Sequence, residues 1–511
     1  LATLYNEGHL YPVEPDATFF VGRLNKAVKD LSPSIRKALV DKIGSDSQFK
    51  NGLFNWAVKQ GIARYDDPTF YETVSHQVAY RLIARILFYQ TLRRYRSDLP
   101  QMDISGLSPA VANQKLREFF EEARQIDWQA VFEEDFPDSI SLPDLAIEEL
   151  AKLIQDLNHY NFSNMPQDII GAVFEELIPY EENHMARQYF TPEDLVDFIN
   201  AFCIRTRDDY VLDPTCGTGT FLTRAYDKMK ILGQREHRKL ISQLWGVDIA
   251  PFPAELATIN LFRQDLSDYV NFPRILLKDF FEIRVRQSFW FPPPKASLDS
   301  SFNLIEQELP TFDAAVGNFP YIRQELINRL VPDYKNSLER TMAEDWLVDY
   351  PDAFVIPKAD LVEYKRAKKE GRQPTVDYSE VEFRLSGQAD IYAYLFFHTG
   401  RFIREGGRMG FVTSNAWLDV AYGYELQRFL LNNFKLIAIL ESRCEPWFED
   451  SAVNTIVTIV ERCSNKEERD EHLAKFVKVK KKLAQLIPWD MKLDAQRRWF
   501  GVDALVRKDG M

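Results

Sequence analysis

Residues 210–221 read YVLDPTCGTGTF, which is a short apolar run, a turn with two glycines and the start of a helical pattern. Glycines at a strand-to-helix turn let a ligand approach the backbone closely, and the first amides of the helix can bind a carboxylate. A phosphate-binding P-loop needs a Gly-Lys-Ser/Thr sequence, and a dinucleotide-binding turn needs a third glycine. Neither of these two signatures is present, so we predict that the turn binds a small ligand of another class.

Short apolar runs recur after this turn and alternate with helical patterns. Strands that alternate with helices predict a doubly wound α/β fold with a mostly parallel sheet covered on both faces. Ligands of such sheets bind beyond the carboxyl ends of the strands, so the residues after each strand are candidates for a site. The predicted strands are residues 210–212, 244–247, 274–277, 313–316, 409–412, 436–440 and 455–460.

Two of these strands are followed by polar residues of interest. Asp248 comes after the second strand, where a carboxylate can accept hydrogen bonds from two ribose hydroxyls, although a helix N-cap is an alternative role. The fourth strand ends in Asn318-Phe319-Pro320-Tyr321. An asparagine offers a carbonyl acceptor and a tyrosine offers a face on which a base can stack. These features predict a site that contacts ribose hydroxyls and a stacked base.

The segment before the first strand reads RQYFTP at residues 187–192. It predicts a helix start, with Thr191 as the cap, Pro192 at the first helical position and Asp194 at the capping-box position. The chain before it, residues 1–180, shows mostly helical periodicity. We therefore predict a helical N-terminal domain at 1–180, an α/β domain at 181–463 with a charged insertion at about 322–388, and an extension at 464–511.

Composition restricts the function further. The chain of 511 residues has 63 basic and 76 acidic residues and a net charge of −13, so any nucleic acid must meet a local basic groove. The four cysteines show no zinc spacing and indicate reduced thiols in a cytoplasmic protein. No apolar run reaches the ~18–20 residues of a membrane span. We expect a cytoplasmic protein without membrane contact.

In combination, the RQYFTP segment, the glycine turn and the tetrapeptide resemble the N6-adenine DNA methyltransferases that use S-adenosylmethionine. These belong to type I and type IIG restriction–modification systems and related phage-defence systems, and the order of motifs is their gamma arrangement. The likeness continues through residues 390–418 and 448–455 and spans about 165–463. It implies a Rossmann-like fold with a seven-stranded sheet and methyl transfer to adenine N6. Because the sulfonium is already activated, it implies neither a metal nor a covalent enzyme intermediate.

The resemblance also implies roles for individual residues. Asn318, Phe319, Pro320 and Tyr321 would hold the target adenine, flipped from double-stranded DNA. Trp417 would either wall the base pocket or belong to the core. The residues that would bind the cofactor are Gln188, Tyr189, Phe190, Thr191, Pro192, Asp213, Thr215, Gly217, Gly219, Asp248, Asp279 and Phe280.

Phe319 departs from the family pattern, which has a proline at this position. If the chemistry uses only the backbone carbonyl, Phe319→Pro is expected to keep or raise the rate, because Pro320 already favours the extended conformation. Two alternatives remain open. The ring fills the base pocket and marks a silenced site, or it packs beneath the pocket and a proline would leave a cavity there.

Other functions and partners also remain open. A degenerate scaffold that binds S-adenosylmethionine or DNA in a defence complex is one alternative. An amino-methyltransferase of RNA or protein is another, although the RQYFTP segment and the long helical region argue against it. The residues after Cys463 are too few for a target-recognition domain of ~100 residues. We therefore expect sequence recognition from a missing or separate region, such as a specificity subunit or another defence-system protein.

Overall fold

The computed structural model divides the chain into two compact units. The first comprises Leu1–Ala186, Phe262–Tyr269 and Ala296–Phe302, and the second comprises Arg187–Leu261, Val270–Lys295 and Asn303–Met511. The three-part division into 1–180, 181–463 and 464–511 stays a prediction. The structure describes residues 17–59, 70–93, 98–125, 136–159, 191–265, 273–291, 305–320, 334–372, 374–385, 389–420, 422–445, 447 and 454–507.

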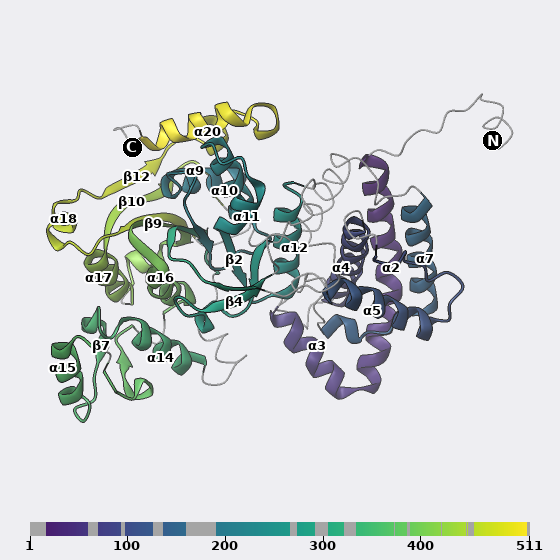
Figure 1. Cartoon of the computed structure of the whole chain (residues 1–511), viewed down its shortest axis with the longest axis horizontal. Coiled ribbons are helices and arrows are strands. Elements are labelled where there is room, and N and C mark those ends of the chain that lie inside the picture. Colours follow the sequence, from purple (N-terminus) through teal and green to yellow (C-terminus); the bar gives the residue numbers. More distant parts are fainter. Residues whose placement is uncertain are drawn as a thin grey trace. The chain divides into compact units, whose positions relative to one another are not determined.

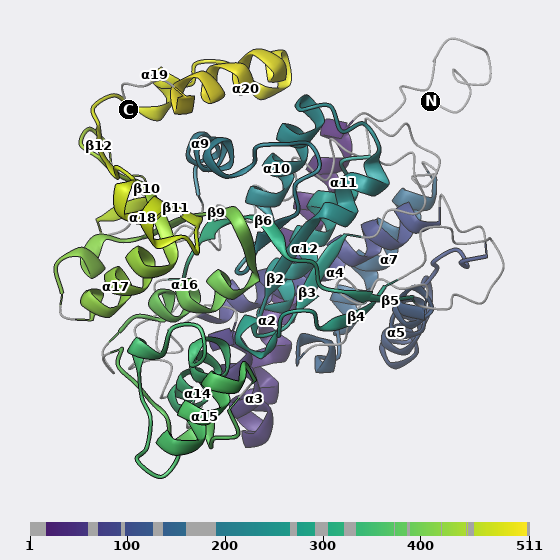
Figure 2. The same ribbon diagram turned by 60° about the vertical axis from the view of Figure 1, so that its left-hand side comes forward.

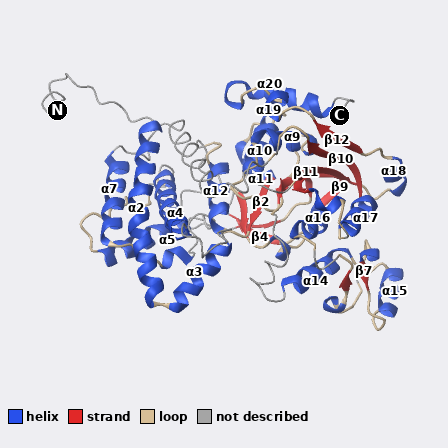
Figure 3. Ribbon diagram, turned by 180° about the vertical axis from the view of Figure 1, so that it is seen from behind, coloured by secondary structure: helices blue, strands red, loops and turns tan. Residues whose placement is uncertain are grey.

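The described part of the first unit contains helices and no strands (Figure 3), which confirms the predicted helical region. Helix α2 packs on α4 and α7, and almost every residue of α4 from Val74 onward is buried. An ion pair of 2.8 Å joins Arg85 of α4 to Asp138. None of the helices in the described ranges combines the length and hydropathy needed to cross a membrane. The elements are α2 (Ala17–Ser45), α3 (Ser47–Lys59), α4 (Phe70–Leu92), α5 (Pro109–Gln125), η1 (Phe136–Ser139) and α7 (Asp144–His159).

The second unit is built on one eight-stranded sheet in the order β12-β10-β11-β9-β6-β1-β2-β3. Figure 1 labels β12, β10, β9 and β2 of this sheet. The five strands from β9 to β3 are parallel, whereas β11 runs antiparallel to both β9 and β10. Each of the seven predicted strands is present, and β12 adds an eighth from the predicted C-terminal extension. The bounds are β1 (Val211–Asp213), β2 (Leu244–Asp248), β3 (Arg274–Leu277), β6 (Phe312–Asn318), β9 (Ile403–Ser414), β10 (Phe434–Ser442), β11 (Thr455–Arg462) and β12 (Lys475–Val479).

Both faces of the sheet are covered by helices (Figure 2). Successive side chains of a strand point to opposite faces, so Val211 packs into one apolar cluster and Leu212 into the other. The first cluster lies under α9 (Glu193–Cys203), α10 (Thr220–Ile231), α11 (His237–Gln243), α12 (Pro251–Phe262) and α20 (Met491–Arg507). The second lies under α14 (Tyr334–Trp346), α16 (Ile391–Phe402) and α17 (Gly423–Asn433). The α/β fold predicted from the alternation of elements is confirmed.

The predicted insertion contains α14 and a small two-stranded sheet. A second two-stranded sheet follows β3, between residues 288 and 308. The remaining elements are β4 (Ser288–Phe291), β5 (Ile305–Glu308), η3 (Phe280–Glu282), η4 (Pro351–Ala353), β7 (Phe354–Val355), α15 (Leu361–Glu370), η5 (Tyr378–Glu380), β8 (Glu382–Phe383), η6 (Asn415–Leu418), α18 (Lys466–Glu471) and α19 (Leu483–Leu486).

Helix α20 is attached to α9 by buried ion pairs. The side chain of Asp197 on α9 is fully buried and accepts hydrogen bonds from Arg224 Nε and Arg498 Nε, each at 2.6 Å. Arg498 also pairs with Asp194 at 2.6 Å. A buried carboxylate needs such partners, because an unpaired charge in the interior costs several kcal/mol. The C-terminal helix is therefore an integral part of this layer.

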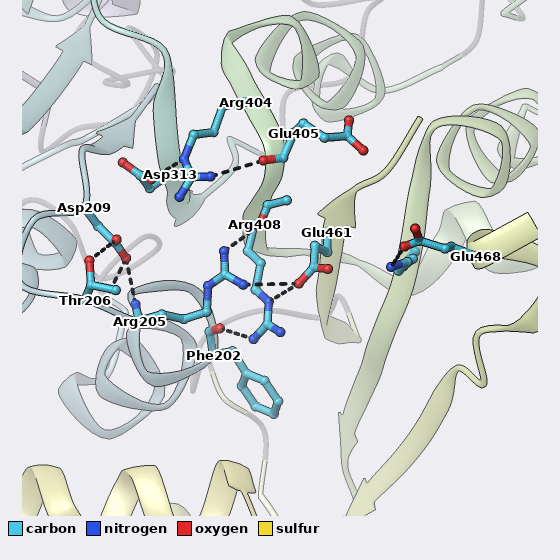
Figure 4. Close-up of polar contacts among 12 residues, drawn as sticks. Phe202, Arg205, Thr206, Asp209, Asp313, Arg404, Glu405, Arg408, Glu461 and Glu468 are labelled. Carbon is cyan, nitrogen blue, oxygen red and sulfur yellow. Dashed lines mark hydrogen bonds and ion pairs between the residues drawn. The ribbon is translucent and has the colours of Figure 1, made fainter. Parts of the chain in front are cut away.

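A network of polar side chains lies at the amino edge of the sheet, where the parallel strands begin (Figure 4). Arg408 of β9 donates to Glu461 of β11 at 2.9 Å and to the Phe202 carbonyl at 2.8 Å. Arg404 pairs with Asp313 at the start of β6. These contacts join β6, β9 and β11 to the end of α9. The opposite edge, at the carboxyl ends of the parallel strands, carries the polar residues predicted to form the site.

Candidate active site

The turn after β1 has the geometry of a ligand cradle. Gly217 and Gly219 adopt φ values of +52° and +81°, which lie in the left-handed region that favours glycine. A Cβ added at Gly219 would lie 3.0 Å from the Cβ of Ala257, whereas one at Gly217 would meet no atom within 4 Å. The turn therefore combines close packing against α12 with open space beside Gly217.

Asp213 ends β1 beneath this turn and is only 1% exposed. Its Oδ1 accepts the Thr215 amide at 3.2 Å. Burial, together with the nearby charge of Asp248, raises the pKa of Asp213 well above its usual range. Thr215 Oγ1 in turn lies 3.4 Å from the carbonyl of Asn318, to which it donates. This contact joins the glycine turn to the end of β6.

Asp248, at the end of β2, orders the same turn. Its Oδ2 accepts the Gly217 amide at 2.9 Å and its Oδ1 accepts the Ala250 amide at 2.8 Å. Burial raises its pKa to about 6. Helix α12 begins only at Pro251, so Asp248 is not its N-cap. Each oxygen of a carboxylate has two lone pairs, and the second lone pairs can accept ribose hydroxyls.

Asp279 and Phe280 follow β3, and the structure separates their roles. Asp279 accepts the Phe281 amide at 3.0 Å and the Tyr334 hydroxyl at 2.5 Å, and it is partly exposed. The Phe280 ring is buried against the ring of His398, with centroids 4.8 Å apart, and its carbonyl accepts from His398 Nε2 at 3.0 Å. The Asp279 carboxylate thus remains near the site edge, whereas the Phe280 ring belongs to the core.

Phe319 is packed beneath the end of β6. Its side chain has no exposed surface, and its ring stacks on Phe411 with a centroid separation of 3.9 Å. Its amide donates to the Val412 carbonyl at 3.2 Å. A proline would lose both the ring contact and this hydrogen bond. The structure therefore weighs against a neutral Phe319→Pro change and favours the alternative of a ring packed beneath the pocket.

The structure describes two of the other three members of the tetrapeptide. Asn318 ends β6 and is partly exposed at the same edge as Asp213, and Pro320 is partly buried. Tyr321 lies outside the described residues. Gly317, which the sequence analysis missed, directly precedes Asn318, and a Cβ there would lie 2.8 Å from Asp213 Oδ1. A glycine inside an apolar strand is the signal that could have indicated this close approach.

The expected start of α9 is wrong in detail. The helix begins at Glu193 with Pro192 as the N-cap residue, so Thr191 does not cap it and Pro192 is not in the first turn. The Pro192 carbonyl accepts the amides of the first turn, and Asp194 pairs with Arg498 instead of closing a capping box. Thr191 is buried and Pro192 is partly buried. Gln188, Tyr189 and Phe190 lie outside the described residues.

Trp417 lies in η6, directly after β9 at the carboxyl edge of the sheet. It is 2% exposed, and its Nε1 has no hydrogen-bond partner among the described residues. Gln427 Nε2 donates to its carbonyl at 3.1 Å. This burial fits the core role, and the edge position fits a pocket wall, so the assignment to the base pocket stays a prediction.

Comparison with known proteins identifies two family regions. Residues 165–346 match the family N-6 DNA Methylase, and residues 363–448 match the family Eco57I restriction-modification methylase. The first match contains the glycine turn and the tetrapeptide, and the second contains Trp417. The two matches thus cover the carboxyl edge of the sheet.

Individual relatives share short stretches. A type I restriction enzyme EcoEI methylase subunit from Escherichia coli is 27% identical over 117 residues, which are 22% of this chain and 24% of that protein. The type II restriction enzyme and methyltransferase RM.BcgI from Heyndrickxia coagulans is 34% identical over 106 residues, 19% of this chain and 16% of that protein. These alignments span about a quarter or less of each relative.

Two solved structures share the fold over most of the chain. One comes from a study of complex assembly in a type I restriction–modification system (TM-score 0.50, 17% identity, 91% of this chain and 85% of that chain). The other is assigned as a modification subunit of a type I restriction enzyme from Vibrio vulnificus YJ016 (TM-score 0.50, 12% identity, 92% and 86%). The sequence resemblance to the N6-adenine DNA methyltransferases of restriction–modification systems is thus confirmed by two family matches, which extend over residues 165–346 and 363–448.

Proposed function

We propose that this protein transfers a methyl group from S-adenosylmethionine to N6 of adenine in DNA. The observation that carries the proposal is the pair of carboxylates, buried Asp213 and partly exposed Asp248, around a glycine turn beside Asn318. Both carboxylates accept hydrogen bonds from backbone amides, and no basic side chain among the described residues forms an ion pair with either of them. S-adenosylmethionine has an ammonium, a sulfonium and one carboxylate, and its net positive charge complements this anionic site.

The residues of the turn fit this cofactor. Gly217 and Gly219 let it approach the backbone, and the first amides of α10 can bind its carboxylate. Asp248 would accept its ribose hydroxyls, Asp213 would face its ammonium group, and Thr215 would order the turn. The segment Gln188 to Pro192 and the Asp279 carboxylate would complete the cofactor site. When bound, the cofactor supplies an activated methyl group.

Asn318 and Phe319 would hold the acceptor amine. The Asn318 Oδ1 and the Phe319 carbonyl each accept one hydrogen of the adenine N6 amine, which orients the nitrogen lone pair. Tyr321 would stack on the base after it leaves the duplex, and Pro320 would keep the segment extended. The chain contributes positioning and fixed dipoles, and misplacement by ~1 Å can cost about 10²-fold in rate.

Double-stranded DNA is the proposed substrate, and the proposed setting is a host-protective modification or phage-defence system in the cytoplasm. The whole protein's partners include, in this proposal, a specificity subunit or another defence-system protein that reads the target sequence. The resemblance to type I and type II methylases supports this assignment.

The test is transfer of a tritiated methyl group from S-adenosylmethionine to purified DNA, RNA and protein in parallel. We expect label in DNA alone. Label in RNA or protein would overturn the DNA assignment. Binding of S-adenosylmethionine without transfer to any acceptor, with the partner proteins present, would identify the chain as a scaffold.

A further inference from the structure

Helix α14, the first described element after the tetrapeptide, is attached to the turn that follows β3. Tyr334, its first residue, donates its hydroxyl to Asp279 Oδ2 at 2.5 Å. The Phe281 amide donates to Oδ1 of the same carboxylate at 3.0 Å. Asp279 and Tyr334 are both partly exposed, so this pair lies at the surface of the turn and not in the core. The two donors fix the plane of the Asp279 carboxylate.

We propose that Tyr334 is a positioning residue that sets the selectivity of the site for the cofactor's base. The inference rests on the proposed function and specifies that the Asp279 carboxylate accepts a hydrogen bond from the amino group of the cofactor's adenine. An ionised carboxylate offers only acceptors. With its orientation fixed by Tyr334, it favours a base that presents an amino donor and disfavours one that presents a carbonyl oxygen.

The other end of α14 has its own attachment to the same turn. Asp345 pairs with His398 Nδ1 at 2.6 Å, and His398 Nε2 lies 3.0 Å from the Phe280 carbonyl. Arg284 and Glu344 form a further contact of 3.0 Å. Loss of the Tyr334 hydroxyl therefore leaves the helix in place. The change Tyr334→Phe removes the hydrogen bond that orients the Asp279 carboxylate and keeps the aromatic ring.

The experiment compares S-adenosylmethionine with its deaminated analogue, in which hypoxanthine replaces adenine, by calorimetric titration of the full chain. We expect the wild-type protein to prefer S-adenosylmethionine by roughly 10²-fold, the scale of one lost hydrogen bond to a charged acceptor. Tyr334→Phe is expected to reduce this ratio about tenfold, the scale of one charge-assisted hydrogen bond. Tyr364→Phe is the matched control. Tyr364 lies on α15, another helix of the insertion, and its hydroxyl donates to the Leu347 carbonyl at 3.1 Å.

A double-mutant cycle with Asp279→Ala isolates the proposed route. In that background Tyr334→Phe is expected to leave the ratio unchanged. An unchanged ratio in the single variant Tyr334→Phe, or an equal loss in Tyr364→Phe, would overturn the inference while leaving the proposed function intact. Failure of the wild-type chain to bind S-adenosylmethionine would instead overturn the proposed function.

Discussion

The titration of Asp248 gives a quantitative prediction. Burial raises its pKa from the ordinary 3.8 to about 6, so the folded chain holds this proton more tightly than the unfolded chain does. The contribution of Asp248 to stability is therefore greatest at low pH and is lost as the pH rises from about 4 to about 6. At 1.36 kcal/mol per pKa unit, the loss from this group amounts to about 3 kcal/mol.

A cationic ligand should reverse this effect. Bound S-adenosylmethionine favours the ionised form of Asp248, so binding near pH 6 expels the proton. At pH 5.5 a group with a pKa of about 6 is roughly three-quarters protonated, and we expect Asp248 to release about that fraction of a proton per cofactor. At pH 8 it should release none. Calorimetric titration in buffers of different ionisation enthalpy measures the number directly.

The matched variants separate Asp248 from the other acids of the chain. Asp248→Asn should release fewer protons than the wild type at pH 5.5. The difference contains the proton of Asp248 together with any change in Asp213, whose pKa the Asp248 charge raises. Glu471→Gln, a change of an exposed carboxylate on α18, should behave as the wild type. Equal proton release from the wild type and Asp248→Asn would refute the reasoning about the anionic site.

Three substitutions test other parts of the structure. Asn318→Ala should leave cofactor affinity near the wild-type value and lower single-turnover methyl transfer by at least about 10²-fold, and a wild-type rate would place the reacting group elsewhere. Phe319→Pro should lower the free energy of unfolding in urea by about 3–5 kcal/mol, because the buried ring and the hydrogen bond to Val412 are lost; an unchanged midpoint would contradict the packing described. Arg498→Met should cost about 3–5 kcal/mol in the same assay by leaving Asp197 underpaired, and little change would show that α20 does not stabilise α9.

Seven strands of the sheet could be predicted from the sequence because most residues of each run are buried and form short continuous apolar segments. The apolar runs at 436–440 and 455–460 both predict strands. Their antiparallel pairing could not be predicted, since an apolar run has no signature of direction. The glycine turn at 217–219 was predictable because left-handed backbone conformations favour glycine.

The site could be predicted where local sequence determines it and not where distant residues meet. Asp248 and Asn318 follow their strands directly, so the topology alone places them at one edge. The packed ring of Phe319 depends on Phe411, which is far away in the sequence. Tyr334 lies in a charged insertion, and no local pattern indicates that its hydroxyl reaches Asp279. Contacts of this kind depend on tertiary packing.

The identity of the methylated nucleoside tests the central claim most directly, namely that Asn318 and the Phe319 carbonyl hold an adenine amine beside the cofactor turn. DNA methylated by the wild-type chain with its partner proteins can be hydrolysed and analysed by mass spectrometry, with Asn318→Ala as the control. We predict N6-methyldeoxyadenosine from the wild type and a loss of at least about 10²-fold from Asn318→Ala. A methylated cytosine, or unmodified DNA from a wild-type protein that binds S-adenosylmethionine, would contradict the account.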